Sequence, residues 1–118
     1  KEGEPIVCLR VIIASGGGTQ SGGLKIARDL GHSVTELAPS LFTFHLKDPR
    51  IEGLQGLAAP DTRVSSPATR LSQAGALLIT HWGMSGPAIL KLSAFGARIL
   101  SDMNYEFTVQ INWVLIVS

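Results

Sequence analysis

The spacing of apolar and polar positions changes along the chain, and the change predicts two different kinds of structure. Residues 6–14 are almost continuously apolar, which is typical of a buried strand. Five of the nine residues at 15–23 are glycines, which predicts a tight loop. Residues 24–30 then carry apolar side chains at helical spacing, and Gly31 follows as a helix-ending residue. The chain is therefore expected to begin with a strand, a glycine loop and a helix.

Most of the remaining chain shows the period-two alternation that is typical of β-strands. Residues 41–46 alternate in this way, which predicts a strand with His45 on its polar face. The one helix expected in this part begins at about Pro87 and ends at about Phe95. Further strands are predicted at residues 32–39, 53–57, 62–66, 76–81 and 105–117. Short loops between strands favour an antiparallel or barrel-like arrangement.

The composition fits one folded domain and argues against several partners. The 118 residues are 45% apolar and 16% charged, which is not a disordered composition. Lysines and arginines are scattered, the net charge is +1 and only 6% of residues are aromatic, so we expect no nucleic-acid partner. No apolar run reaches the roughly 20 residues of a membrane span, so we expect no membrane partner either.

Cysteine and histidine usage adds little chemistry. The single cysteine, Cys8, lies in the apolar run and is expected to be buried. It excludes an intramolecular disulfide and is compatible with a reducing, cytoplasmic location. The three histidines are far apart in the sequence, so no metal site is expected. No paired carboxylates, hydrolase elbow or Walker lysine are present, and we assign no catalytic residue.

The most specific stretch of the chain runs from Thr80 to Leu90. It joins the end of a predicted strand to the start of the predicted helix through a glycine-containing turn. Ser85 is expected to cap the helix with its hydroxyl, and the first-turn amides would then suit an anion. His81 is expected either to contact a ligand or transfer a proton, or to stabilise the turn by a hydrogen bond. The loop at 15–23 is likewise open to two interpretations, a phosphate contact or a structural turn.

Three stretches resemble the HI0933-like (BaiN/YhiN-type) family of NAD(P)/FAD-dependent flavoproteins. Residues 11–17, Val-Ile-Ile-Ala-Ser-Gly-Gly, resemble a segment of the family's flavin domain. Residues 24–32 resemble the helix that follows it, and residues 77–90 resemble a family motif of high specificity. The N-terminal G-x-G-x-x-G unit of the family is absent, and the chain neither begins with Met nor ends in a polar tail. We therefore expect an interior segment of a longer protein.

The resemblance implies an α+β fold in two parts. Residues 1–34 would form the edge of a Rossmann-like flavin domain, and residues 35–118 would form part of a mostly antiparallel, barrel-like insert domain with one helix. The parent would be a flavin (FAD)-dependent oxidoreductase, with a nicotinamide cofactor, NAD(P)H, as its proposed electron source and a small molecule as its substrate. This chain alone would be inactive.

The resemblance also implies which residues lie near FAD, while the residues themselves leave an alternative open. By position, Ala14, Ser15, Gly16 and Gly17 would lie near the cofactor through backbone groups. The stretch Thr80–Pro87 would lie near the junction of the two domains, which adds His81, Ser85 and Gly86. The alternative is a stand-alone β-rich module that binds an anionic ligand or a protein partner. The last strand, at residues 105–117, would need a neighbour to complete a sheet, which favours a protein partner for the module; in a cut segment the same strand would pair edge to edge with another copy.

Overall fold

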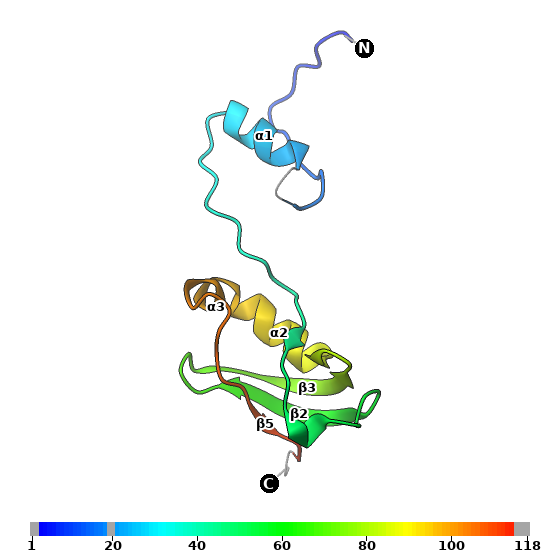
Figure 1. Ribbon diagram of the computed structural model, residues 1–118. Helices are drawn as coiled ribbons and strands as arrows, with labels where there is room; N and C mark the ends of the chain where they lie inside the picture. Colours follow the sequence, from blue (N-terminus) through cyan, green and yellow to red (C-terminus); the bar gives the residue numbers. More distant parts are fainter. Residues whose placement is uncertain (1–2, 19–20, 115–118) are drawn as a thin grey trace. The chain divides into compact units, whose positions relative to one another are not determined.

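The computed structural model describes residues 3–18 and 21–114, and it divides the chain into two compact units, Lys1–Leu37 and Ala38–Ser118 (Figure 1). Each unit is described by itself. The end of the last predicted strand, at residues 115–117, and two residues of the glycine loop lie outside the described residues. The boundary expected between residues 34 and 35, which separates a flavin domain from an insert domain, stays a prediction.

The first unit contains one helix, α1 (Gly22–Asp29), which confirms the helix expected after the glycine loop. It begins slightly earlier than the apolar spacing indicated, directly after Ser21. The helix ends as predicted, because Gly31 has a left-handed φ of 88° and donates its backbone N–H to the Arg28 carbonyl at 2.9 Å. An exposed pair joins Lys25 Nζ to Asp29 Oδ2 at 2.6 Å, one turn apart.

The predicted strand at residues 6–14 is wrong for this structure. The described part of the run has no regular structure, and Ile6 is 89% exposed. Cys8, expected to be buried, is exposed as well. A strand needs a neighbour for its backbone hydrogen bonds, and the described residues of the first unit contain none. The predicted strand at residues 32–39 is absent as well, and the described residues of the first unit do not show the expected Rossmann-like edge, which stays a prediction.

The second unit is built on a curled antiparallel sheet in the order β1-β4-β3-β2-β5. This confirms the β-rich, barrel-like character expected of the region. The long hairpin of β2 (Ala58–Ser66) and β3 (Leu71–Thr80) forms its centre. Three short strands flank the hairpin: β1 (Phe44–His45), β4 (Gly83–Ser85) and β5 (Gln110–Asn112).

Several strand boundaries differ from the prediction. The predicted strand at residues 53–57 is a turn, with left-handed Gly53 and Gly56, although Gly56 still donates its N–H to the Ile79 carbonyl at 2.9 Å. The turn signal at Pro60 lies inside β2, where the register shifts between Ala59 and Thr62. Proline has no N–H to donate, so it is tolerated at such an irregularity.

Two helices lie between strands β4 and β5 in the chain. Helix α2 (Pro87–Phe95) has the predicted bounds and lies along one face of the β2–β3 hairpin, as Figure 1 shows. Helix α3 (Ala97–Asp102), which the sequence pattern did not indicate, follows after the single residue Gly96. The fully buried core residues come from both layers: Val64, Leu77, Ile79, Ala88, Ile89, Leu92 and Leu100.

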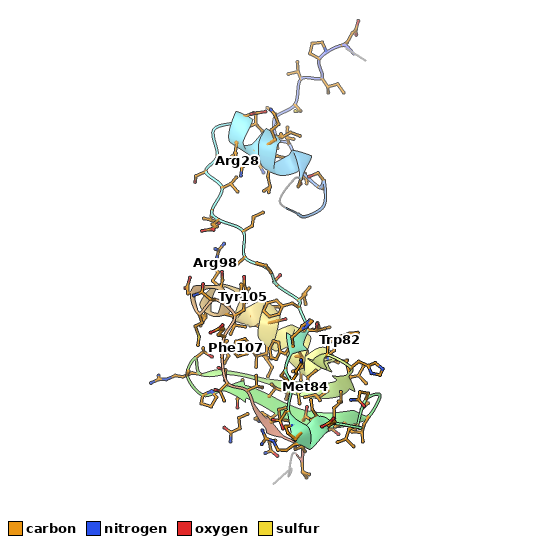
Figure 2. The ribbon with its side chains drawn as sticks, in the orientation of Figure 1. Arg28, Trp82, Met84, Arg98, Tyr105 and Phe107 are labelled. Carbon is orange, nitrogen blue, oxygen red and sulfur yellow. The ribbon has the colours of Figure 1, made fainter. Side chains whose placement is uncertain are left out.

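Aromatic side chains bring the two ends of the sheet together. Phe44 of β1 is buried and meets Phe107 edge to face, with ring centroids 5.1 Å apart, while His45 is exposed as predicted. Phe42 meets Tyr105 in the same way at 5.5 Å (Figure 2). Every second residue from 107 to 111 packs against the core, as the predicted alternation requires. Only Gln110–Asn112 pair as a strand.

Candidate functional site

The specific stretch from Thr80 to Leu90 forms the β3–β4 turn, strand β4 and the start of α2. Its glycines are required by close packing. Gly83 has a φ of 146°, and a Cβ there would lie 2.2 Å from the carbonyl oxygen of Phe44. Gly86 has a φ of 102°, and a Cβ there would lie 2.8 Å from the carbonyl oxygen of Ala76. The glycine spacing of the motif therefore allows β4 to approach β1 and β3 closely. Packing within the fold is a sufficient reason for these glycines.

The expected role of Ser85 as a helix cap is wrong. Ser85 belongs to β4 and pairs with Leu78 of β3, and the residue at the N-cap of α2 is Gly86, which has no capping side chain. Ala88 and Ile89, whose amides were expected to be open to an anion, are fully buried. The start of α2 packs against β3 at Gly75, where a Cβ would lie 3.4 Å from the Ala88 nitrogen. An anion has no access to these amides.

His81 lies in the exposed turn between β3 and β4, next to a cavity of about 380 Å³. The turn is attached to the chain after β1 through a backbone bond from the Leu46 N–H to the Trp82 carbonyl at 3.1 Å. Polar and charged side chains form much of the cavity lining: Lys47, Asp48, Glu52, Gln55, Thr80 and His81. The Thr80 hydroxyl oxygen is buried and has no hydrogen-bond partner among the described residues. The expected ligand or proton-transfer role of His81 stays a prediction.

Asp48 has the most strongly organised carboxylate of this region. It caps the 3-10 helix η1 (Pro49–Ile51), accepting from the backbone N–H and from Nε of Arg50, each at 2.9 Å. These hydrogen bonds and the positive charge of Arg50 lower the pKa of Asp48 from 3.8 to about 2. Asp48 is therefore ionised at neutral pH and unsuited to act as a general acid.

The residues expected near FAD in the first unit form an exposed loop in front of α1. The Ser21 hydroxyl donates to the Gly16 carbonyl at 3.1 Å and lies 3.2 Å from the Ser15 hydroxyl. Gly16 has a left-handed φ of 77°, and Gly23 has no room for a side chain, since a Cβ would lie 2.0 Å from Ser15 Oγ. The loop thus folds back on the first turn of α1 and leaves the backbone of residues 14–17 exposed.

The structure does not test whether the two sets of expected cofactor residues form one site. Ala14, Ser15, Gly16 and Gly17 belong to the first unit, and His81, Ser85 and Gly86 to the second. Within residues 3–18 and 21–114, no three His, Cys, Asp or Glu side chains are grouped so that they could hold a metal. None of the helices in that same part of the chain is both long and apolar enough to cross a bilayer.

The sequence reasoning missed a group of exposed side chains on the helices. Phe95, the last residue of α2, is 74% exposed. Lys91 precedes it by one helical turn and Arg98 follows on α3, and both are exposed. Lys91 and Phe95, four residues apart in one helix, lie on the same face. That spacing is visible in the sequence, where Phe95 was named only as the approximate end of the helix.

A curled antiparallel sheet with two successive helices on one face defines a barrel-and-helix domain. Residues 38–115 match the family model described as "HI0933-like protein barrel and H2TH domain". This match spans most of the chain and coincides with the second unit. The chain therefore belongs to the HI0933-like family, as its motifs led us to expect.

Two relatives of this chain share one name. The chain is 34% identical over 120 residues to ribosomal RNA dihydrouridine synthase of Escherichia coli (strain K12), an alignment covering 88% of this chain and 30% of that protein. It is 33% identical over 96 residues to ribosomal RNA dihydrouridine synthase of Haemophilus influenzae (strain ATCC 51907 / DSM 11121 / KW20 / Rd), covering 75% of this chain and 23% of that protein. The chain thus spans less than a third of the length of either relative.

Proposed function

We propose that this chain is the barrel-and-helix part of a flavin-dependent oxidoreductase that reduces uridine to dihydrouridine in ribosomal RNA. The observation that carries the proposal is the 34% identity, over 88% of the chain, to an enzyme named for that product. The family match over residues 38–115 supports the proposal, because it covers nearly all of the second unit with a domain of the HI0933-like family. The barrel part supports substrate and cofactor binding, and the chain alone is inactive.

The chemistry follows from the product. Dihydrouridine differs from uridine by two hydrogens across the C5–C6 bond of uracil, so its formation is a two-electron reduction that adds one hydride and one proton. Bound FAD, reduced by a nicotinamide cofactor, supplies the hydride. Among the side chains of this sequence, the thiol of the single Cys8 is the one redox-active group of the usual kind.

The residues expected to hold FAD fit that role in the first unit. The exposed backbone of residues 14–17 offers N–H and carbonyl groups without covering side chains, and the left-handed Gly16 turns the chain toward α1. Ser15, by contrast, is packed against Gly23 and Ser21, so it positions the loop. We propose that Ala14, Gly16 and Gly17 contact the cofactor through their backbone, while Ser15 holds the loop in place.

The proposal replaces two expectations that rested on composition. A small-molecule substrate gives way to a uridine within ribosomal RNA, and the expected absence of a nucleic-acid partner gives way to RNA binding. Lysines and arginines are scattered in the sequence, which argued against an RNA-binding surface. Residues that are far apart in the sequence can nevertheless lie close together on the surface of the folded protein. Activity on ribosomal RNA agrees with the cytoplasmic location expected from the sequence.

Two measurements on the full-length parent test the proposal. The purified parent is expected to be yellow, with the absorption bands of oxidised flavin, and the bands should bleach when NADPH or NADH is added without oxygen. Ribosomal RNA from cells that lack the gene should lose dihydrouridine, measured by mass spectrometry of its nucleosides, and the restored gene should return it. A colourless parent, or an unchanged dihydrouridine content, would contradict the proposal.

A second candidate is the protein-binding module, which the exposed edges of the sheet favour. Strands β1 and β5 are the two edge strands, and Trp113, directly after β5, is exposed beside an apolar cavity of about 710 Å³. Edge strands offer unpaired backbone groups to another chain. Size-exclusion chromatography tests this candidate, since a monodisperse monomer supports a self-contained module, whereas aggregation or edge-to-edge dimers contradict it and indicate a cut segment. The burial of Ala88 and Ile89 disfavours an anion at their amides, so we propose a protein partner for this candidate.

A further inference from the structure

We infer that an extended segment of the parent protein, from outside these 118 residues, docks as a further strand between the two edges of the curled sheet. One edge is the stretch at residues 42–48, which contains β1, and the other is the stretch at residues 105–113, which contains β5. Below, the space between these two stretches is called the seam. The docked strand has apolar side chains at alternate positions and completes the barrel, whatever reaction the parent catalyses.

Each edge strand is paired on one side only. In the part of the chain that the structure describes, β1 pairs with β4 alone and β5 pairs with β2 alone. The free side of an edge strand offers backbone N–H and carbonyl groups, and a further strand can pair with them. The seam therefore has a half-paired strand on each side.

The chain directly before β5 has the pattern of a strand but no partner. Phe107 and Val109 pack against the core, while Thr108 between them is exposed, so the alternation of β5 extends back to residue 107. β5 pairs with β2 at Gln110–Asn112, and residues 107–109 make no backbone hydrogen bond to other described residues. In a sheet, the backbone groups of an extended segment pair with those of a neighbouring strand. Residues 107–109 therefore lie where the sheet lacks a strand.

A groove follows the seam. The two edges meet through two aromatic contacts, Phe42 with Tyr105 and Phe44 with Phe107. A cavity of about 590 Å³ borders all four rings, and its lining comes from both edges. The cavity of about 710 Å³ beside Trp113 shares part of this lining. Side chains thus bring the edges together, while the space along them is open to a further segment.

The lining of the seam favours a polypeptide over RNA. Apolar and aromatic side chains form much of it: Phe42, Phe44, Leu46, Phe107 and Val109. Asp48 and Arg50 form an ion pair with each other, which leaves Lys47 as the lysine or arginine of this lining without an ion pair among the described residues. RNA needs a series of cations along its phosphates. A peptide strand with alternating apolar side chains matches the lining instead.

The lengths of the relatives favour a segment of the same protein. The alignments with the two relatives cover 30% and 23% of their lengths, so most of each relative lies outside the matched region. The family model that matches residues 38–115 is described as a barrel, whereas the described residues form a sheet with two edges. Closing a barrel gives both edge strands a second neighbour. A segment of the same polypeptide is also held at high local concentration, so it competes well with a separate protein or a second copy.

Hydrogen–deuterium exchange of the full-length parent, followed by mass spectrometry with fragmentation to single residues, tests the inference. The amides of residues 107–109 should be protected in the parent relative to an unstructured peptide of the same sequence. In the 118-residue chain the same amides should exchange faster by about tenfold or more, because the docked strand is missing. The β2–β3 hairpin should be protected in both, which shows that the isolated chain is folded.

A pair of variants of the parent tests the groove itself. Val109→Asp places a carboxylate in the seam, so the protection of residues 107–109 should fall to its value in the isolated chain. Leu78→Asp is the matched control, since Leu78 is 37% exposed on β3 and does not line the seam. It should leave the protection of residues 107–109 unchanged. Equal effects of the two substitutions would contradict a strand docked in the seam.

Three further outcomes would overturn the inference. One is a parent in which residues 107–109 exchange as fast as in the unstructured peptide. Another is protection that is already present in the isolated chain, which makes a second copy the occupant where the protection rises with concentration. The third is protection of the isolated chain that requires added ribosomal RNA. The exchange measurements need neither flavin reduction nor dihydrouridine, so their failure is distinguishable from failure of the proposed function.

Discussion

Replacing Gly83 with alanine tests whether the glycines of the β3–β4 turn serve the fold. The new Cβ would lie 2.2 Å from the Phe44 carbonyl oxygen, 2.7 Å from the Leu46 nitrogen and 3.2 Å from the His45 Cα. All three contacts are to backbone, so no side chain can rotate out of the way. The substitution therefore forces β1 and β4 apart, and it endangers the hydrogen bond from Leu46 N–H to the Trp82 carbonyl.

The magnitude has two parts, and a matched control separates them. Placing a non-glycine residue at the left-handed φ of 146° costs about 1–3 kcal/mol. Gly53→Ala also places alanine at a positive φ, of 78°, but a Cβ there meets nothing within 4 Å, so this variant carries backbone strain without steric overlap. The steric overlap is particular to Gly83 and should bring its loss of unfolding free energy to about 4 kcal/mol or more, a value typical of severe packing defects.

Urea unfolding followed by tryptophan fluorescence measures both variants, because Trp82 lies in the same turn. The expected result is a large decrease in the free energy of unfolding for Gly83→Ala and a small decrease for Gly53→Ala. Equal decreases in the two variants would refute the reasoning, since the turn would then need glycine for its φ angle alone. The glycine spacing of the motif would in that case remain open to a ligand-based explanation.

Three further predictions concern single side chains of the second unit. Ser85→Ala should change the free energy of unfolding by less than about 0.5 kcal/mol, because Ser85 caps no helix; a loss near the 1 kcal/mol typical of a lost N-cap would contradict this. Leu92→Ala should lower it by about 2–5 kcal/mol, because Leu92 is fully buried between α2 and the sheet; a loss below 1 kcal/mol, measured in urea, would place it outside the core. Asp48 should titrate with a midpoint of about 2 in a carboxyl NMR experiment, and Arg50→Ala should return the midpoint toward 3.8. Because the folded state favours the ionised carboxylate, this contribution to the free energy of unfolding is present above pH 3.8 and is lost as the pH falls from about 3.8 to about 2. An unchanged midpoint in the Arg50→Ala variant would show that Arg50 is not the cause.

Local patterns were sufficient where the structure itself is local. Helix α2 has its predicted bounds because Pro87 suits a first turn and Gly96 follows the last apolar position. Gly31 ends α1 through its left-handed φ, as a helix-ending glycine should. The period-two pattern also placed Phe44 in the core and His45 in solvent. Each of these predictions depends on residues within one or two turns of each other.

The predictions that failed depend on distant parts of the chain. The apolar run at 6–14 has strand propensity, but in the described part of the first unit no neighbouring strand pairs with it. Ser85 looked like a helix cap because the sequence does not reveal that β4 pairs with β3 as far as this residue.

The most direct test of the proposed activity is the reaction itself. The full-length parent, incubated with FAD, NADPH and ribosomal RNA from cells that lack the gene, should convert uridine to dihydrouridine, a mass increase of two hydrogens in the released nucleoside. Omitting NADPH or the parent should leave the nucleoside mass unchanged. Ribosomal RNA that gains no dihydrouridine, from a parent shown to hold flavin that NADPH reduces, would contradict the account.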